Sequence, residues 1–170
     1  MTERPPFIRH YQELPSKRGS YEGDDELMSE GTLLSRALGL TRLGIWHEQL
    51  PPGTRTSWPH AEEKEEEFVF VLEGAPDAFI DGVLHRLAPG DCVAFAPGTG
   101  ITHSILNNTD APVRLLCIGE KLAGNRFFYA MHPNGYQGMK AEEHWHDAPR
   151  RALGPHDGLP DALRASKSKG

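Results

Sequence analysis

Two histidines and one glutamate have side chains suited to metal binding: His60, Glu67 and His103. They lie on separate predicted strands within two glycine-punctuated segments, 53–74 and 90–107. Two imidazoles and a carboxylate on a rigid wall suit a first-row divalent metal, and with open coordination positions they correspond to the 2-His-1-carboxylate arrangement. A single histidine is more often a polar side chain satisfied by hydrogen bonds. The prediction of a metal site therefore depends on these three residues lying together.

The elements that must position these side chains are strands. From residue 40 to residue 119, apolar and β-branched runs alternate with turn signals at the short spacing typical of a sandwich or barrel. Asp81-Gly82 favours a two-residue hairpin, because both residues tolerate positive φ. The predicted strands are 41–49, 67–73, 78–80, 83–87, 92–96, 102–106, 113–119 and 126–129.

The alternation of side chains along a strand predicts which residues face the interior of such a barrel. His60 and Glu62 share one parity, so they point inward together, as do His103 and Asn107. Most of the acidic run at 62–67 is expected to be a solvated loop. Glu67 is the exception, because it adjoins an apolar strand.

The two glycine-punctuated segments resemble the two motifs of the cupin superfamily, over residues 40–120. In the first, Glu67 is followed by six residues and Gly74; in the second, His103 is followed by three residues and Asn107. His60 takes the position of the first histidine of the family. The chain departs from the family at Glu62, which stands where a second histidine is expected, and the glycine spacings differ by a residue.

This resemblance implies an all-β fold, a cupin-type double-stranded β-helix or jelly-roll barrel. The expected organisation is an N-terminal arm with a short helix (1–39), the barrel (40–130) and an irregular C-terminal tail (131–170) whose end is disordered. The helix is predicted at 32–38, with Thr32 as its cap and Gly39 as its stop.

The resemblance also implies that His60, Glu67 and His103 are the ligands of a divalent metal ion, with Mn, Fe or Zn favoured by the nitrogen and oxygen donors. Glu62 is then either a fourth ligand or the catalytic base. Asn107 is expected in a turn rather than at the metal. His144 and His146 lie in a polar tail and are interpreted as surface residues, whereas His156 is a candidate to approach the barrel mouth.

Among cupins, the chain most closely resembles a bacterial subgroup described as sugar phosphate isomerases. A metal with open positions acts as a Lewis acid that orients two substrate oxygens and stabilises an enediolate, and Glu62 is the candidate base. A phosphorylated substrate requires cationic partners, for which Arg55, Arg86 and Arg126 are candidates, although a surface position is the simpler interpretation. The alternatives are an iron-dependent oxygenase at the same site and a non-catalytic small-ligand binding protein.

Composition restricts the partners of this chain. It has 170 residues, 38% hydrophobic and 25% charged, which is typical of one globular domain. A net charge of −6 argues against nucleic acid, which requires a basic face. No apolar stretch is long enough to cross a bilayer and no signal peptide is evident, so we expect a cytoplasmic protein without a membrane partner. Cys92 and Cys117 are expected to be reduced, buried thiols.

The pattern of apolar residues along the strand 67–73 predicts a protein partner. Val69 and Val71 share one face of this strand, and Phe68, Phe70 and Leu72 share the other. Because both faces are apolar, the aromatic face should be covered by a second subunit or by the N-terminal arm. A homodimer is the simpler prediction.

Overall fold

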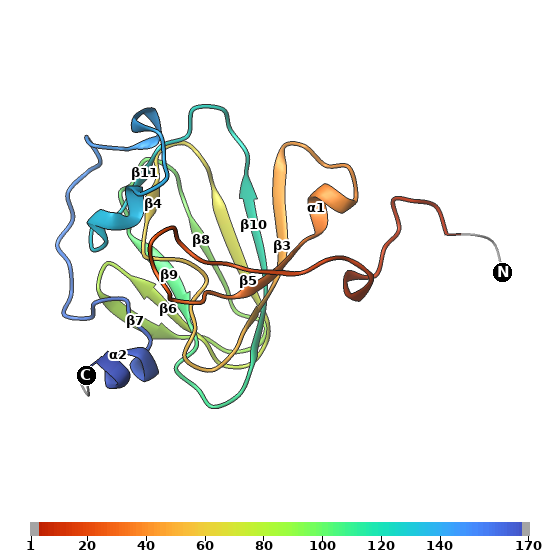
Figure 1. Cartoon of the computed structure of the whole chain (residues 1–170), viewed down its shortest axis with the longest axis horizontal. Helices are drawn as coiled ribbons and strands as arrows, with labels where there is room; N and C mark the ends of the chain where they lie inside the picture. Colours follow the sequence, from red (N-terminus) through yellow and green to blue (C-terminus); the bar gives the residue numbers. More distant parts are fainter. Residues whose placement is uncertain (1–3, 168–170) are drawn as a thin grey trace.

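The computed structural model describes residues 4–167 and confirms the all-β jelly-roll barrel (Figure 1). A sheet of six strands, in the order β1-β2-β3-β10-β5-β8, faces a sheet of three, β7-β6-β9, and a short pair, β11-β4, completes the barrel wall. Within the described residues, no helix has the length and apolar character needed to cross a bilayer. The strands are β1 (Lys17–Arg18), β2 (Glu30–Leu33), β3 (Leu43–Leu50), β4 (Ala61–Glu62), β5 (Glu67–Glu73), β6 (Asp77–Ile80), β7 (Val83–Arg86), β8 (Cys92–Phe95), β9 (His103–Leu106), β10 (Val113–Glu120) and β11 (Phe127–Phe128).

All eight predicted strands are present, with ends that differ by at most two residues. The predicted hairpin joins β6 to β7, where Ile80 pairs with Val83. Both turn residues have positive φ, 46° at Asp81 and 82° at Gly82, as this turn type requires.

The N-terminal arm is more ordered than predicted. It contains β1 and β2, which pair with each other, and β2 also pairs with β3, so that Thr32 lies opposite His47. The predicted helix is present but short, α1 (Leu34–Ala37), and Thr32 does not cap it because Thr32 belongs to β2. β2 forms because its backbone groups hydrogen-bond to the edge of β3. Local residue preferences do not predict this pairing. A 3₁₀ turn, η1 (Tyr11–Glu13), precedes β1 in the arm.

The core lies between the two large sheets. Val71, Ile105 and Leu115 are at most 2% exposed and pack with Leu50 and Val113. On β5, Val69 and Val71 point into this core, whereas Phe68 and Phe70 are only half-buried on the outer face. The arm pairs along the opposite edge of the sheet from β5 and packs Tyr11 on His47 of the outer face, with ring centroids 4.2 Å apart, so it covers part of this face at β3.

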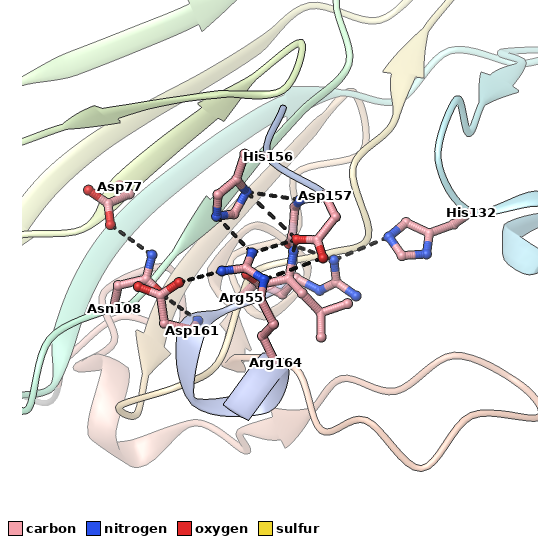
Figure 2. A network of polar contacts seen from close by, with 10 residues as sticks. Arg55, Asp77, Asn108, His132, His156, Asp157, Asp161 and Arg164 are labelled. Atoms are coloured by element: carbon pink, nitrogen blue, oxygen red, sulfur yellow. Dashed lines mark hydrogen bonds and ion pairs between the residues drawn. The ribbon is translucent and has the colours of Figure 1, made fainter. Parts of the chain in front are cut away.

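The C-terminal tail also contains more structure than predicted. It includes two 3₁₀ turns, η2 (Pro133–Tyr136) and η3 (Ala141–Glu143), and a helix, α2 (Asp161–Lys167). Arg164 of α2 forms an ion pair with Asp157 of the preceding turn, 2.6 Å long, and another with Asp161 in the first turn of the helix, 2.7 Å long. Both contacts are drawn in Figure 2. The predicted disorder at 165–170 is wrong for residues 165–167, which lie in α2, and its remainder lies outside the described residues.

Candidate metal centre

The three predicted ligands come from different parts of the barrel wall. His60 and His103 pair directly across two neighbouring segments: the His60 amide donates to the His103 carbonyl at 3.2 Å, and the His103 amide donates to the His60 carbonyl at 2.9 Å. Glu67 begins β5 on the opposing sheet, where it pairs with Phe95 and Gly119. The barrel closure therefore brings both histidines over this carboxylate.

Ligand atoms of His60, Glu67 and His103 all lie within 4.8 Å of one another. Oε2 of Glu67 is 2.5 Å from Nε2 of His103 and 3.8 Å from Nε2 of His60. In each histidine, Nδ1 lies next to a backbone carbonyl, that of Trp58 at 2.9 Å or that of Ile101 at 3.0 Å. A proton on Nδ1 satisfies this carbonyl and leaves the Nε2 lone pair directed at the shared point, the usual orientation of metal-binding histidines. The donor set fits a divalent cation.

Burial and charge favour the ligand forms of these side chains. His60 and His103 are 9% and 6% exposed, and the ring of His103 stacks on Phe95. Burial lowers the pKa of His60, which keeps its imidazole neutral at pH 7. Burial alone would raise the pKa of Glu67, but the hydrogen bond with His103 and the electrostatic effect of the two neighbouring imidazoles outweigh it and lower this pKa to about 2.

Glu62 lies beside this cluster, as its parity with His60 predicts. Its Oε1 is 3.8 Å from Nε2 of His60, and its Oε2 is buried without a hydrogen-bond partner among the described residues. Burial, followed by the negative charge of Glu67, raises the pKa of Glu62 to about 9. A cation at the cluster would favour its ionised form.

A cavity of about 270 Å³ gives access to the cluster. Its wall includes the three predicted ligands, Glu62 and the buried ring of Phe95, which stacks on His103. Trp46 and Lys121 also contribute to the wall, and sequence reasoning missed both. Trp46 lies inside the predicted strand 41–49 and Lys121 lies just after the predicted strand 113–119, but the pairing of those strands is not visible in the sequence.

The three arginines considered for substrate binding are all engaged elsewhere. Arg55 is fully buried, so its interpretation as a surface residue is wrong. Arg86 pairs with Asp77 and Arg126 pairs with Glu63, both at 2.6 Å. None of the three belongs to the described wall of the metal cavity.

Arg55 instead connects the two terminal segments. Its guanidinium donates to both carboxylate oxygens of Glu26 at 2.7 and 2.6 Å and to the carbonyl of Gly158 at 2.7 Å. Nη1 also lies 3.3 Å from Nε2 of His132, a contact that is drawn in Figure 2. The side chain of Arg55 thus links the N-terminal arm to the C-terminal tail.

The remaining candidate histidines lie away from the cavity wall. His156 lies 3.0 Å from the Arg164 guanidinium and accepts the Gly158 amide, so it belongs to the turn before α2. His144 and His146 pack around Tyr136, with ring centroids 4.3 and 6.3 Å from it, and only His146 is exposed.

Two further expectations concern Asn107 and the cysteines. Asn107 is confirmed as a turn residue, because its amide donates to the carbonyls of Leu50 and Ala111. Both cysteines are free, as predicted. Cys92 is exposed, which corrects its predicted burial, because its side chain points to the outer face of the sheet beside Phe70. Cys117 is half-buried and lines the metal cavity.

Two facing sheets with a His–Glu–His cluster on their inner wall define a jelly-roll barrel with a candidate metal centre. The cupin domain model matches residues 46–119, which make up less than half of the chain.

Solved structures are similar to this chain. A protein from Silicibacter pomeroyi described as a sugar phosphate isomerase from a cupin superfamily is 34% identical, with a TM-score of 0.59; the match covers 60% of this chain and 65% of that one, just under two thirds of its length. A protein from Acidithiobacillus ferrooxidans with a similar description is 26% identical, with a TM-score of 0.67 and coverages of 73% and 81%. A predicted oxalate decarboxylase from Thermotoga maritima, 23% identical with a TM-score of 0.57 and coverages of 68% and 99%, shares the fold. The sequence matches no curated protein.

Proposed function

We propose that this protein is a metal-dependent isomerase of a small polyhydroxy substrate, of the sugar phosphate class. The observation that carries the proposal is the convergence of Nε2 of His60, Nε2 of His103 and Oε2 of Glu67 in an accessible cavity, with the Glu62 carboxylate beside them. The descriptions of the Silicibacter and Acidithiobacillus proteins support the reaction class.

In this proposal, His60, Glu67 and His103 hold a divalent cation, with Mn, Fe or Zn fitting the donor set. The bound cation supplies Lewis-acid polarisation of substrate oxygens. The buried aromatic side chain of Phe95 lines the cavity and narrows the access of water to it.

Glu62 is assigned the proton transfer. Isomerisation takes a proton from the carbon next to a carbonyl and returns one to the former carbonyl carbon, while the hydroxyl proton moves to the former carbonyl oxygen. A carboxylate that reaches both carbons performs the carbon transfers without a second base. Glu62 lines the cavity with one buried oxygen that has no partner among the described residues.

Glu62→Gln is expected to lower kcat by about 10²–10⁴-fold, the usual contribution of a positioned base. The amide retains the size of the side chain, so bound metal per chain should be unchanged. Aldose–ketose exchange is measured on metal-loaded protein with a panel of sugar phosphates. Glu63→Gln is the matched control, because that neighbouring carboxylate pairs with Arg126 outside the cavity. An unchanged kcat in Glu62→Gln would remove Glu62 from the proposed mechanism.

The same donor set fits an iron-dependent oxygenase, since two histidines and one carboxylate leave positions open for other ligands. Metal identity and oxygen consumption separate the two functions: oxygen-independent exchange supports the isomerase, whereas iron with substrate-dependent oxygen uptake supports the oxygenase. A wild type that purifies without metal, together with a His60→Ala/His103→Ala variant that keeps its ligand affinity, would instead identify a binding protein.

We further propose that the outer face of the large sheet is the interface of a homodimer. Beside His47, which Tyr11 of the arm covers, apolar side chains of this face lie on three neighbouring strands, β3, β10 and β5, and these apolar side chains are at least partly accessible in the single chain. Strand pairing places Ile118 between Ile45 and Phe68, and Leu116 next to Phe70. The cytoplasmic location expected from the sequence remains a prediction.

Leu72→Arg is expected to convert the dimer into a monomer, because a buried unpaired charge opposes association. Leu72 is 43% exposed on the outer face, and Leu153 is 42% exposed near the β6–β7 hairpin, so Leu153→Arg is a matched control. Sedimentation equilibrium should give dimers for the wild type and for Leu153→Arg. A monomeric wild type at micromolar concentrations would contradict the interface.

A further inference from the structure

We propose that the substrate carries an oxyanion, a phosphate ester or a carboxylate, which binds between the ammonium group of Lys121 and the indole N–H of Trp46, above Gly44. This inference rests on the proposed function, because it assigns a chemical class to the substrate of the same cavity. It concerns a part of the cavity wall separate from the three predicted metal ligands.

Two glycines connect the proposed anion site with the candidate metal centre. Gly119 of β10 pairs with Glu67 of β5 on one side and with Gly44 of β3 on the other. Gly44 and Gly119 both line the cavity, so no side chain stands on this line between Glu67 and Gly44. Two strand spacings separate the backbone of Glu67 from that of Gly44, about 10 Å. That span suits a small carbon chain with oxygens to polarise at one end and an anion at the other.

The surroundings of Gly44 place two donors next to the same point. A methyl group on Gly44 would lie 3.5 Å from Cε of Lys121 and 3.6 Å from Nε1 of Trp46. Because Gly44 has no side chain, the space between these two groups is open to the cavity. The indole N–H can only donate and the ammonium group has three donors, so both require acceptors.

Neither donor has a partner elsewhere in the described part of the chain, where no hydrogen bond or ion pair involves Nζ of Lys121 or Nε1 of Trp46. In contrast, Nε1 of Trp58 donates to Glu26 at 3.2 Å. Lys121 is also the one lysine or arginine among the described residues of the cavity wall.

Carboxylates on the same wall restrict where an anion can bind. Glu65 accepts the Leu122 amide at 2.5 Å, and Glu120 accepts the Glu66 amide at 3.1 Å. Their negative charge still repels an anion over most of the wall, so an oxyanion is attracted only where Lys121 contributes a cation. Charge-assisted hydrogen bonds from an ammonium group to an oxyanion are among the strong ones, and a second donor beside it fixes the direction of the ligand.

The test follows the three indole N–H resonances of the metal-free full-length chain during titration with inorganic phosphate at constant ionic strength. We expect the Trp46 resonance, assigned by its loss in Trp46→Phe, to shift saturably. Those of Trp58 and Trp145 should remain still, because Trp58 is bonded to Glu26 and Trp145 is buried. A parallel titration with acetate distinguishes the sources: a response to phosphate alone indicates a phosphate ester, and a stronger response to acetate indicates a carboxylate.

Lys121→Gln should weaken the phosphate response at least tenfold, as expected for losing a hydrogen bond to a charged group. Lys140→Gln is the control, because Lys140 is exposed on the tail. Gly44→Ala should also weaken the response while leaving the fold intact, since its methyl group would make only ordinary contacts. A Trp46 resonance that neither anion moves, or equal affinities in Lys121→Gln and the wild type, would overturn the proposal. Because this titration needs neither metal nor turnover, its failure is distinguishable from failure of the proposed isomerase.

Discussion

His103→Ala and His60→Ala are each expected to weaken divalent metal binding at least about 100-fold, since removing a residue that merely orients a ligand already costs about 10–100-fold. Each substitution removes one of the nitrogen donors that lie within 4.8 Å of the other ligand atoms of the cluster. It also removes one of the two imidazoles beside the Glu67 carboxylate. Activity should be lost together with the metal.

Isothermal titration of the metal-free chain with Mn²⁺ measures this prediction, and the wild type should bind one equivalent. At a free metal concentration 100 times Kd, binding adds about 2.7 kcal/mol to the free energy of unfolding. For a chain of this size that corresponds to a rise in Tm of about 5–10 °C, and neither variant should show it. His85→Ala is the matched control, because His85 is an exposed histidine on β7. A wild type without stoichiometric metal after reconstitution would contradict the candidate metal centre.

Arg55→Met is expected to lower the free energy of unfolding by about 3–5 kcal/mol, the usual cost of removing one partner of a buried ion pair. The side chains of Arg55 and Glu26 are 0% and 7% exposed, so the substitution leaves a carboxylate buried without its counter-charge. It also removes the donor to the Gly158 carbonyl. Urea unfolding followed by tryptophan fluorescence measures the change.

The control for Arg55→Met is Arg114→Met. Arg114 pairs with Glu73, but these side chains are 41% and 58% exposed, so the loss of stability should be much smaller than that of Arg55→Met. Adding Glu26→Leu to Arg55→Met should recover part of the lost stability, because the unpaired carboxylate is then removed. An Arg55→Met protein that unfolds at the wild-type urea midpoint would show that the buried pair contributes nothing net. The double variant separates a charge effect from a packing effect.

The strands were predictable where the signal is local. Alternation along 67–73 and the Asp81-Gly82 pair determine a strand and a hairpin through backbone preferences that act over a few residues. The missed elements β1, β2 and β4 are two to four residues long, and each exists because a neighbouring strand accepts its hydrogen bonds. The helix α2 is stabilised by Arg164, whose ion pair with Asp157 depends on the turn before the helix.

By itself, the sequence determined the barrel class and the candidate metal ligands His60, Glu67 and His103. Both follow from local patterns, the alternation of apolar residues along strands and the spacing of glycines at turns. The sequence also placed Glu62 on the same face as His60. Only the tertiary structure decided where the arginine and lysine side chains lie. Arg55 is buried against Glu26, whereas Lys121 lies beside Trp46 next to Gly44. The physical reason is strand register. The alignment of β3 and β5 on either side of β10 depends on contacts between residues far apart in the chain, and no local pattern encodes it.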